Sequence, residues 1–240
     1  MEIKEFKEEL KKYLIELNIE LKEKQINQLY DYMNLLIEWN KKINLTAIIE
    51  PKEIILKHFV DSLTISKYIN EKSTLIDIGT GAGFPGIPLK ILRDDINITL
   101  VDSLNKRIKF LDEVIEKLNL DNIKTVHGRA EEIGRNTEYR EKFDYATSRA
   151  VANIATLSEY LIPLINKNGK CIYMKGPNID DELEKGKNAI SVLGGIIVNK
   201  DEFELPYSDI KRTIIVIEKI KNTSAKYPRK AGMPAKEPII

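Results

Sequence analysis

From Thr74 onward, short runs rich in β-branched residues alternate with segments whose apolar residues follow a helical spacing. The extended runs are TLIDI (74–78), ITLVD (98–102), IKTVHG (123–128), FDYATS (143–148) and GKCIYMK (169–175). Helical patterns such as NKRIKFLDEVIEKLN and ANIATLSEYLIPLIN lie between them. Strands joined through helices require right-handed crossovers, so this alternation predicts a parallel sheet covered by helices on both faces.

Two further extended runs, GGIIVNKDEFELP (194–206) and RTIIVIEKI (212–220), are separated by a short turn region without a helix. They predict a terminal antiparallel pair. Five parallel strands followed by such a pair is the order of elements in the seven-stranded methyltransferase fold. The predicted fold class is therefore α/β, with a Rossmann-like, mostly parallel seven-stranded sheet and an N-terminal helical extension.

The segments before and after this region have different patterns. Apolar residues recur at three and four from Phe6 to Leu17 and again from Ile26 to Ile37, which predicts two amphipathic helices. A shorter helix is expected to begin at Pro51, because proline is favoured in a first helical turn. We therefore predict a helical cap over 1–70, a catalytic domain over 71–221 and a basic tail over 222–240.

The composition is that of an ordinary globular protein: 240 residues, 42% hydrophobic and 31% charged, with a net charge of +1. No apolar run approaches the roughly 20 residues of a membrane span, and the N-terminal sequence does not resemble an export signal. Cys171 is the single cysteine, which excludes an intrachain disulfide. These features predict a cytoplasmic protein. With two histidines and one cysteine, a metal site has little support.

The segment DIGTGAGFPGIP (77–88) holds four glycines that fit two ligand-binding patterns. Counted from Gly79 it is G-x-G-x-G, the loop that lies under S-adenosylmethionine in many methyltransferases. Counted from Gly81 it is the dinucleotide fingerprint G-x-G-x-x-G. Both patterns follow a strand, precede a helix, and expect an acid at the end of the next strand to bind ribose, which Asp102 supplies. These features do not separate the two.

Asp77 favours the first pattern. A carboxylate beside a pyrophosphate would impose like-charge repulsion in a partly desolvated cleft. The sulfonium and ammonium of S-adenosylmethionine are cations, which a carboxylate attracts. The local physics therefore favours the methyl donor over a dinucleotide, although a glycine pattern alone is weak evidence.

Several segments carry a resemblance to a known family. NLTAI (44–48), HFVDSL (58–63), DIGTGAGFPGIPL (77–89), VDS..KR..FL (101–111), GRAEE (128–132), SRAVA (148–152) and YPRKAGMPAKEP (227–238) occur in the same order as in the RsmG/GidB family of ribosomal RNA small-subunit methyltransferases. The chain resembles this family from about residue 40 to its C-terminus. The first forty residues are less diagnostic.

The resemblance implies a cytoplasmic enzyme that transfers a methyl group from S-adenosylmethionine to guanine N7 in a conserved loop of 16S rRNA near the decoding centre. Carried over by motif, the family's cofactor contacts fall on Gly79, Phe84, Ala130, Glu131 and Arg149. Guanine N7 has an in-plane lone pair and no proton, so we expect no general base. Catalysis would then depend on alignment and on stabilising charge on the purine.

Roles can be proposed for the residues of the predicted cofactor site. Gly79, Gly81 and Gly83 would give backbone access to the methionine moiety, and Asp77 would attract its ammonium directly or through water. Asp102, with Ser103 beside it, would accept hydrogen bonds from ribose hydroxyls, and Ala130 and Glu131 would frame the adenine. Phe84 would pack on the cofactor or support the loop. Arg149 would face the cofactor or form an ion pair with Asp77 or Glu131.

The tail is the predicted RNA contact. It combines Arg229, Lys230 and Lys236 with Tyr227 and two prolines, a stiff basic segment suited to phosphates, and its alternative is a disordered terminus. Lys175 at the end of the fifth strand would border the target base. His58 and His127 are expected to be structural, and Cys171 a core thiol.

Two other functions remain open on the residues alone. The first is an NAD-dependent oxidoreductase that uses the pattern from Gly81. The second is a non-catalytic RNA-binding factor in ribosome assembly that retains the fold. We also expect a monomer without a membrane partner.

Overall fold

The computed structural model describes residues 1–149 and 152–240, and Ala150 and Val151 of the SRAVA segment lie outside the described residues. All seven predicted strands form a single sheet with the order β3-β2-β1-β4-β5-β7-β6. The strands are β1 (Thr74–Ile78), β2 (Asn97–Asp102), β3 (Ile123–His127), β4 (Phe143–Arg149), β5 (Ile165–Lys175), β6 (Gly195–Glu204) and β7 (Lys211–Lys219).

The pairing confirms the predicted fold class. Strands β1 to β5 pair in parallel, whereas β7 pairs antiparallel with both β5 and β6. The order reverses between β1 and β4, which puts a topological switch point at the carboxyl ends of these two strands. Open α/β sheets bind their ligands at such a point.

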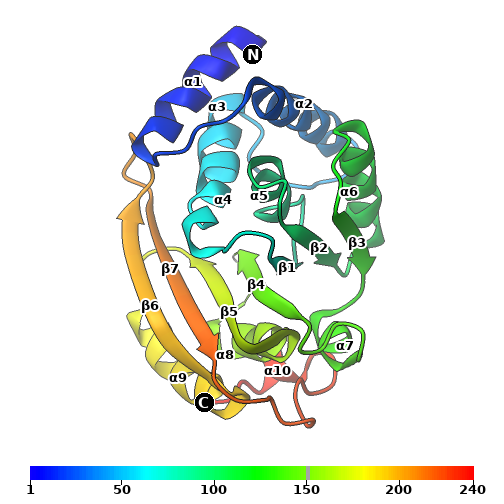
Figure 1. The fold of residues 1–240 in the computed structure, drawn as a ribbon, viewed down its shortest axis with the longest axis vertical. Coiled ribbons are helices and arrows are strands. Elements are labelled where there is room, and N and C mark those ends of the chain that lie inside the picture. The colour runs from blue at the N-terminus through cyan, green and yellow to red at the C-terminus, as the bar shows by residue number, and fades with distance from the viewer. Residues whose placement is uncertain (150–151) are drawn as a thin grey trace.

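Helices cover both faces of the sheet (Figure 1). The helices of the sheet region are α5 (Gly86–Leu92), α6 (Asn105–Lys117), α7 (Ala130–Arg135), α8 (Ile154–Leu161), η3 (Ile162–Leu164), α9 (Asp180–Leu193) and α10 (Met233–Lys236). One predicted helical pattern ends early. Ile162–Leu164 forms a 3₁₀ turn and β5 begins at Ile165, because Pro163 lacks the N–H that an α-helix needs.

Alternate strand residues supply the two hydrophobic cores. In β7, Ile214 and Val216 pack with the N-terminal helices and α5, whereas Ile215 and Ile217 pack with α8 and α9. This period of two is what a strand buried on both faces requires. The molecule therefore has three layers, helices on either side of a twisted sheet.

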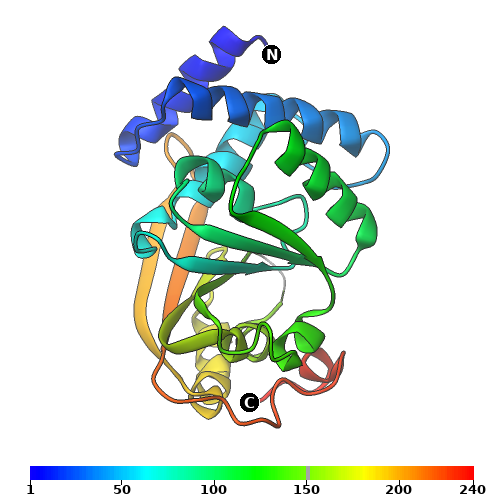
Figure 2. The same ribbon diagram turned by 45° about the vertical axis from the view of Figure 1, so that its right-hand side comes forward.

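The N-terminal helices lie over one face of the sheet (Figure 2). They are α1 (Ile3–Glu16), α2 (Glu23–Asn40), α3 (Pro51–Ile54), the π-helical turn η1 (Ile55–Val60), α4 (Asp61–Leu63) and the 3₁₀ turn η2 (Ser66–Tyr68). The two long helices and the start at Pro51 are as predicted. Their apolar residues share one core with Leu75 and Leu100 of the sheet. The domain boundary at residue 70 stays a prediction.

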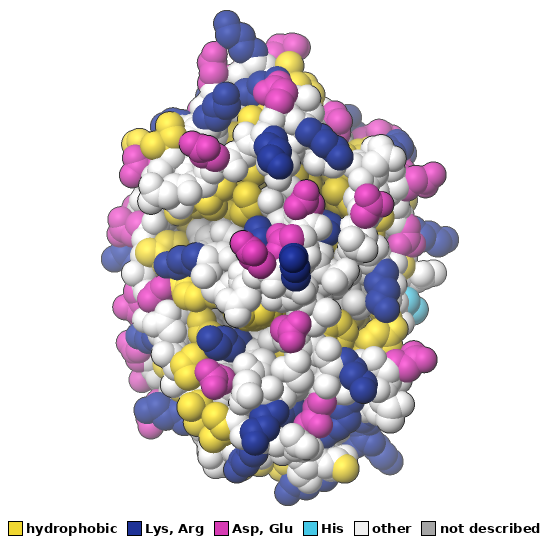
Figure 3. Space-filling view, viewed as in Figure 1, with side chains coloured by type: hydrophobic (Ala, Val, Ile, Leu, Met, Phe, Trp, Pro, Cys, Tyr) yellow, Lys and Arg dark blue, Asp and Glu magenta, His cyan; other side chains and the backbone are white. Residues whose placement is uncertain are grey.

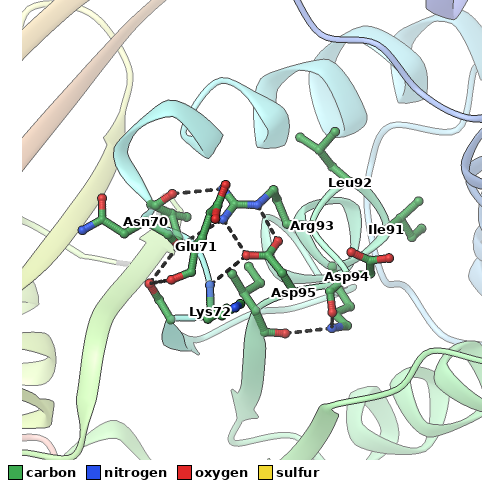
Figure 4. A network of polar contacts seen from close by, with 12 residues as sticks. Asn70, Glu71, Lys72, Ile91, Leu92, Arg93, Asp94 and Asp95 are labelled. Atoms are coloured by element: carbon green, nitrogen blue, oxygen red, sulfur yellow. Dashed lines mark hydrogen bonds and ion pairs between the residues drawn. The ribbon is translucent and has the colours of Figure 1, made fainter.

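A hydrogen-bond network closes the amino edge of the sheet (Figure 4). The Arg93 guanidinium donates to Asp95 Oδ1 at 2.7 Å and to the carbonyls of Ile69 and Asn70 at 3.0 Å. Asp95 Oδ2 also accepts from the Lys72 N–H at 2.8 Å. The network ties the segment before β1 to the turn after α5, at the edge of the sheet opposite the carboxyl ends.

The segment 222–240 packs onto the body of the protein. Tyr227 and Pro228 are buried, and Arg140 donates to the carbonyls of Tyr227 at 2.7 Å and Thr223 at 2.8 Å. The Thr156 hydroxyl donates to the Pro234 carbonyl at 3.0 Å. The tail is therefore an ordered part of the surface next to α7 and α8.

Candidate functional site

The glycine loop between β1 and α5 has a positive φ at each of the three glycines of the first pattern. Gly79, Gly81 and Gly83 have φ values of 68°, 64° and 97°, which favour glycine. Gly86 lies in the first turn of α5, and its N–H donates to Asp77 Oδ2 at 3.1 Å. Gly86 therefore serves the turn into the helix, as expected for the pattern counted from Gly79.

Asp77 lies beneath this loop and not in front of it. Its side chain is fully buried, and Oδ2 accepts from the Thr80 hydroxyl at 2.7 Å as well as from Gly86. Oδ1 has no hydrogen-bond partner. The carboxylate lines neither of the cavities described below, so it does not occupy the position predicted for a direct contact with an ammonium. It holds the loop from below.

Burial raises the pKa of Asp77 from 3.8 to about 6, in spite of the hydrogen bonds from Thr80 and Gly86. The native state is therefore most favoured below the unfolded-state pKa and loses stability as the pH rises from about 4 to about 6. The pKa difference between the folded and unfolded states corresponds to about 3 kcal/mol in the free energy of unfolding. Asp77→Asn is expected to be more stable than the wild type by up to this amount at pH 7.5, and the difference should vanish near pH 4. Urea unfolding at both pH values measures it, and a pH-independent difference would contradict the assignment.

The first cavity, of about 300 Å³, lies at the carboxyl ends of β1, β2 and β3. Its lining includes five residues predicted for the cofactor, Gly79, Asp102, Ser103, Ala130 and Glu131. It also includes residues for which the sequence predicted no cofactor role, among them Gly128, Tyr160 and Gly232. The structure thus brings the glycine loop and the GRAEE segment together across the end of the sheet.

Asp102 lies between the loop and α6. Its Oδ2 accepts from the Gly81 N–H at 3.0 Å and from Arg107 Nη1 at 3.1 Å, and its Oδ1 accepts from the Leu104 N–H at 2.9 Å. A carboxylate has about four acceptor positions, so Oδ1 keeps capacity for one hydroxyl. This position fits the predicted ribose contact.

Glu131 connects the first cavity to the tail. Its Oε1 accepts from the Gly232 N–H at 2.7 Å. Since Gly232 lines the same cavity, the ordered tail forms part of the wall. The sequence placed Glu131 at the cofactor but did not predict its contact with the tail.

Two residues predicted to contact RNA have other partners in the structure. Arg229 forms an ion pair with Glu159, 2.7 Å from Nη2 to Oε2, and its own N–H donates to Glu159 Oε1 at 2.6 Å. Lys175 Nζ lies 2.7 Å from Glu182 Oε1 and donates to the Ala152 carbonyl at 2.8 Å. Both cations are therefore held by buried or half-buried partners, and the RNA contacts predicted for them stay predictions.

Lys230 and Lys236 remain exposed on either side of Gly232. Lys and Arg side chains gather at the lower end of the face in Figure 3, where Figure 1 places the tail and α9. The RNA contact predicted for these two lysines stays a prediction.

Replacement of Arg229 by alanine tests whether this residue anchors the tail to the body of the protein. Arg229→Ala leaves the Glu159 carboxylate, which is 1% exposed, without its cation, so we expect the free energy of unfolding to fall by about 2 to 4 kcal/mol. The affinity for the cofactor should fall as well, because the tail forms a wall of the cavity. Lys230→Ala is the matched control, with an expected stability change within about 0.5 kcal/mol. Equal stability of the two variants, measured by urea unfolding, would refute the anchoring role.

The second cavity, of about 450 Å³, shares Gly79, Asp102 and Ser103 with the first. Away from these residues its lining includes Thr46, His58, Phe84 and Arg149, which come from the two N-terminal motifs, the loop and β4. The N-terminal region therefore builds one side of the site.

Arg149 is nearly buried in this second cavity and has an ion-pair partner that the sequence did not indicate. Its Nη1 lies 3.3 Å from Asp61 Oδ2 and 3.1 Å from the Lys57 carbonyl. Asp61 also binds Arg212, at 3.0 Å. The alternative ion pair with Asp77 or Glu131 was wrong, because the N-terminal segment supplies a nearer carboxylate.

His58 and Phe84 stack beside Arg149, with ring centroids 4.3 Å apart. The guanidinium lies 5.0 Å from the Phe84 centroid, and Arg149 Nη2 lies 3.0 Å from His58 Nδ1. Burial and the neighbouring Arg149 lower the pKa of His58 to about 3. The imidazole is therefore neutral at physiological pH. Phe84 contributes to the wall of the cavity and also packs on Tyr32, so both of its predicted roles fit.

The other sequence expectations can be located as well. Gly83 faces the interior beside Tyr32, Ile87 and Leu111, and so it packs the loop instead of lining a cavity. Burial raises the pKa of the Cys171 thiol, in agreement with a core thiol. Sequence reasoning also missed Thr46, which lines the second cavity, and Asp61, which pairs with Arg149; the motifs NLTAI and HFVDSL contain them, but nothing local shows what they face.

The site fits S-adenosylmethionine on its own geometry. A Cβ on Gly81 would meet only the Gly79 carbonyl, at 4.0 Å, so the loop leaves open space for a ligand against its backbone. The carboxylates of Asp102 and Glu131 line the first cavity, and Asp102 also lines the second. No group of three or more His, Cys, Asp or Glu side chains in 1–149 and 152–240 is arranged to hold a metal ion. Within the same ranges, no helix has the length and apolarity to cross a membrane.

A seven-stranded sheet of this order, with a glycine loop and an acid at the end of β2, defines the class of the methyltransferase fold. A family model described as GidB, rRNA small subunit methyltransferase G, matches residues 25–210. The chain belongs to this family, which confirms the resemblance and the expectation of a methyltransferase that uses S-adenosylmethionine.

Relatives named ribosomal RNA small subunit methyltransferase G are similar over nearly the whole chain. The protein of Desulforamulus reducens is 54% identical over 232 residues, covering 96% of this chain and 97% of its own. That of Alkaliphilus oremlandii is 53% identical over 237 residues, covering 98% and 99%.

Solved structures show the same fold at low identity. TYW2 of M. jannaschii in complex with AdoMet has a TM-score of 0.53 at 15% identity, covering 67% of this chain and 75% of its own. TrmN from Thermus thermophilus has a TM-score of 0.52 at 13% identity, covering 69% and 53%.

Proposed function

We propose that this protein transfers a methyl group from S-adenosylmethionine to N7 of a guanosine in the 16S rRNA of the bacterial small ribosomal subunit. Membership of the family supports rRNA of the small subunit as the substrate. We further propose that the enzyme acts in the cytoplasm as a monomer, on RNA held in part by Lys230 and Lys236.

The observation that carries the choice of N7 is the chemistry of the second cavity. Among the described residues that line it, none is free to take a proton. His58 is neutral but its Nδ1 is occupied by Arg149, and Asp102 accepts from three donors and keeps its remaining acceptor position for the ribose of the cofactor. A cavity without a free base suits an acceptor atom that carries a lone pair and no proton, which is the case for guanine N7.

The chain's own residues therefore act by binding and orientation. The cofactor, when bound, supplies a methyl group on a sulfonium. The glycine loop and Asp102, which are shared by the two cavities, would hold it, and the second cavity would receive the base. Phe84 and His58 form a stacked wall against which the base would pack, while the carboxylate of Asp102 would stabilise positive charge that moves onto the purine.

Methyl transfer from labelled S-adenosylmethionine to unmodified 16S rRNA and to 30S particles, with mapping of the modified base, tests the proposal. The expected result is one methylguanosine, and no transfer when 7-deazaguanosine replaces the target. Binding of RNA without transfer to either substrate would favour a non-catalytic assembly factor. Binding of NADH but not of S-adenosylmethionine would favour the oxidoreductase.

A further inference from the structure

Thr46 lines the second cavity, and the groups around its hydroxyl determine the hydrogen-bonding role of that hydroxyl. Thr46 belongs to the segment after α2, and it is held by Asn40 at the end of that helix. Asn40 Oδ1 accepts from the N–H groups of Leu45 and Thr46 at 2.7 and 2.9 Å, and its Nδ2 donates to the Thr46 carbonyl at 2.9 Å. The position of the hydroxyl is therefore fixed by a backbone clamp.

The protonation of His58 follows from its other neighbour. A guanidinium can only donate hydrogen bonds, so Arg149 Nη2 donates to His58 Nδ1, 3.0 Å away. Nδ1 is then unprotonated. Because the imidazole is neutral, its proton lies on Nε2. His58 Nε2 lies 3.0 Å from Thr46 Oγ1 and must donate to it.

The Thr46 hydroxyl is thereby left with one free hydrogen-bond donor, its proton. Its oxygen accepts from His58 and also from the Ile48 N–H, at 3.1 Å. A hydroxyl has two acceptor lone pairs and one proton, so both lone pairs are occupied. The proton has no acceptor among the described residues and remains for a ligand in the cavity.

We propose that Thr46 is a specificity-determining residue that donates its hydroxyl proton to O6 of the target guanine. This inference rests on the proposed function, guanine N7 methylation. On the edge of guanine that carries N7, the neighbouring group is the acceptor O6, whereas adenine presents an N6 amino donor there. Because Thr46 cannot accept a further hydrogen bond, it favours guanine and opposes adenine. The same bond holds N7 in register with the methyl group.

The test compares kcat/KM for two enzyme variants on two target bases, as in a double-mutant cycle. Wild type and Thr46→Val act on 16S rRNA that carries either guanosine or 2-aminopurine riboside at the target; the latter keeps N7 but lacks O6. We expect Thr46→Val to lower kcat/KM on guanosine by about tenfold to a hundredfold, because a donor to a substrate oxygen is lost. On 2-aminopurine its effect should be less than about threefold. Affinity for S-adenosylmethionine should not change.

Two controls separate recognition from structure. Thr46→Ser keeps the hydroxyl and should restore kcat/KM on guanosine to within a few fold, and Thr46→Ala provides a second cycle if the valine variant is unstable. An equal fold loss on both bases would overturn the inference, since a structural defect affects both alike. Absence of transfer by the wild type to guanosine would instead remove the proposed function itself.

Discussion

Replacement of Gly83 by alanine is expected to lower the free energy of unfolding by about 3 to 5 kcal/mol. Gly83 has a φ of 97°, which strains an alanine. A Cβ there would also lie 2.6 Å from Ile87 Cδ1, 2.7 Å from the Tyr32 hydroxyl and 2.9 Å from Leu111 Cδ2. Tyr32 cannot yield easily, because it is fully buried and donates to the Ala82 carbonyl.

Gly81→Ala is the matched control two residues earlier in the same loop. Its φ of 64° carries a similar backbone cost of about 1 to 2 kcal/mol, but its Cβ meets no atom closer than 4.0 Å. We expect Gly81→Ala to remain folded and to lose affinity for S-adenosylmethionine, since the methyl group enters the open space over the loop. Thermal unfolding and calorimetry compare the two variants. Equal stability would show that Gly83 is not a packing position.

Replacement of Arg149 by methionine is the second large effect. The guanidinium and Asp61, whose side chain is 3% exposed, form a nearly buried pair. Loss of one partner from such a pair costs up to about 3 to 5 kcal/mol, and the loss should lie below that range here because Arg212 still pairs with Asp61. The variant also removes the donor that fixes the protonation of His58, and with it the orientation of the Thr46 hydroxyl. We expect methyl transfer to fall more than the affinity for S-adenosylmethionine.

Arg93→Met is the control for this experiment. Arg93 also binds one carboxylate and two backbone carbonyls, but at the amino edge of the sheet, and its partner Asp95 is 27% exposed. We expect it to reduce stability by about 1 to 2 kcal/mol without any change in cofactor affinity. If both variants lose methyl transfer only in proportion to their lost stability, Arg149 has no role in the site beyond folding.

The sequence predicted most of the scaffold because the scaffold depends on local patterns. The β-branched runs became strands within one or two residues of their predicted bounds, apart from β5, which begins at Ile165 and not at Gly169. The glycines at 79, 81 and 83 adopt positive φ, a property of the residue type that can be recognised without neighbours. The acid at the end of β2 and the GRAEE segment reached the same cavity because the carboxyl ends of parallel strands share one edge.

The contacts that the sequence did not indicate involve partners distant in sequence. Asp77 was predicted to attract the cofactor because it is an acid beside the glycine loop. Its burial under Gly86 depends on the packing of α5 against β2. Arg229 and Lys175 have the residue type of RNA contacts, yet Glu159 and Glu182 hold them. Charge alone does not distinguish a free cation from a paired one.

The sequence by itself therefore determined the sheet, the position of the glycine loop and the family, because periodicity, glycine conformation and motif order are properties of the chain read in order. Only the tertiary structure decided which side chains share a cavity. The contact of Arg149 with His58 spans 91 positions and that of Glu131 with Gly232 spans 101. The folded structure decides which donors and acceptors come within about 3 Å of one another and so form hydrogen bonds. The unpaired proton of the Thr46 hydroxyl could therefore be identified only from the positions of all of its neighbours.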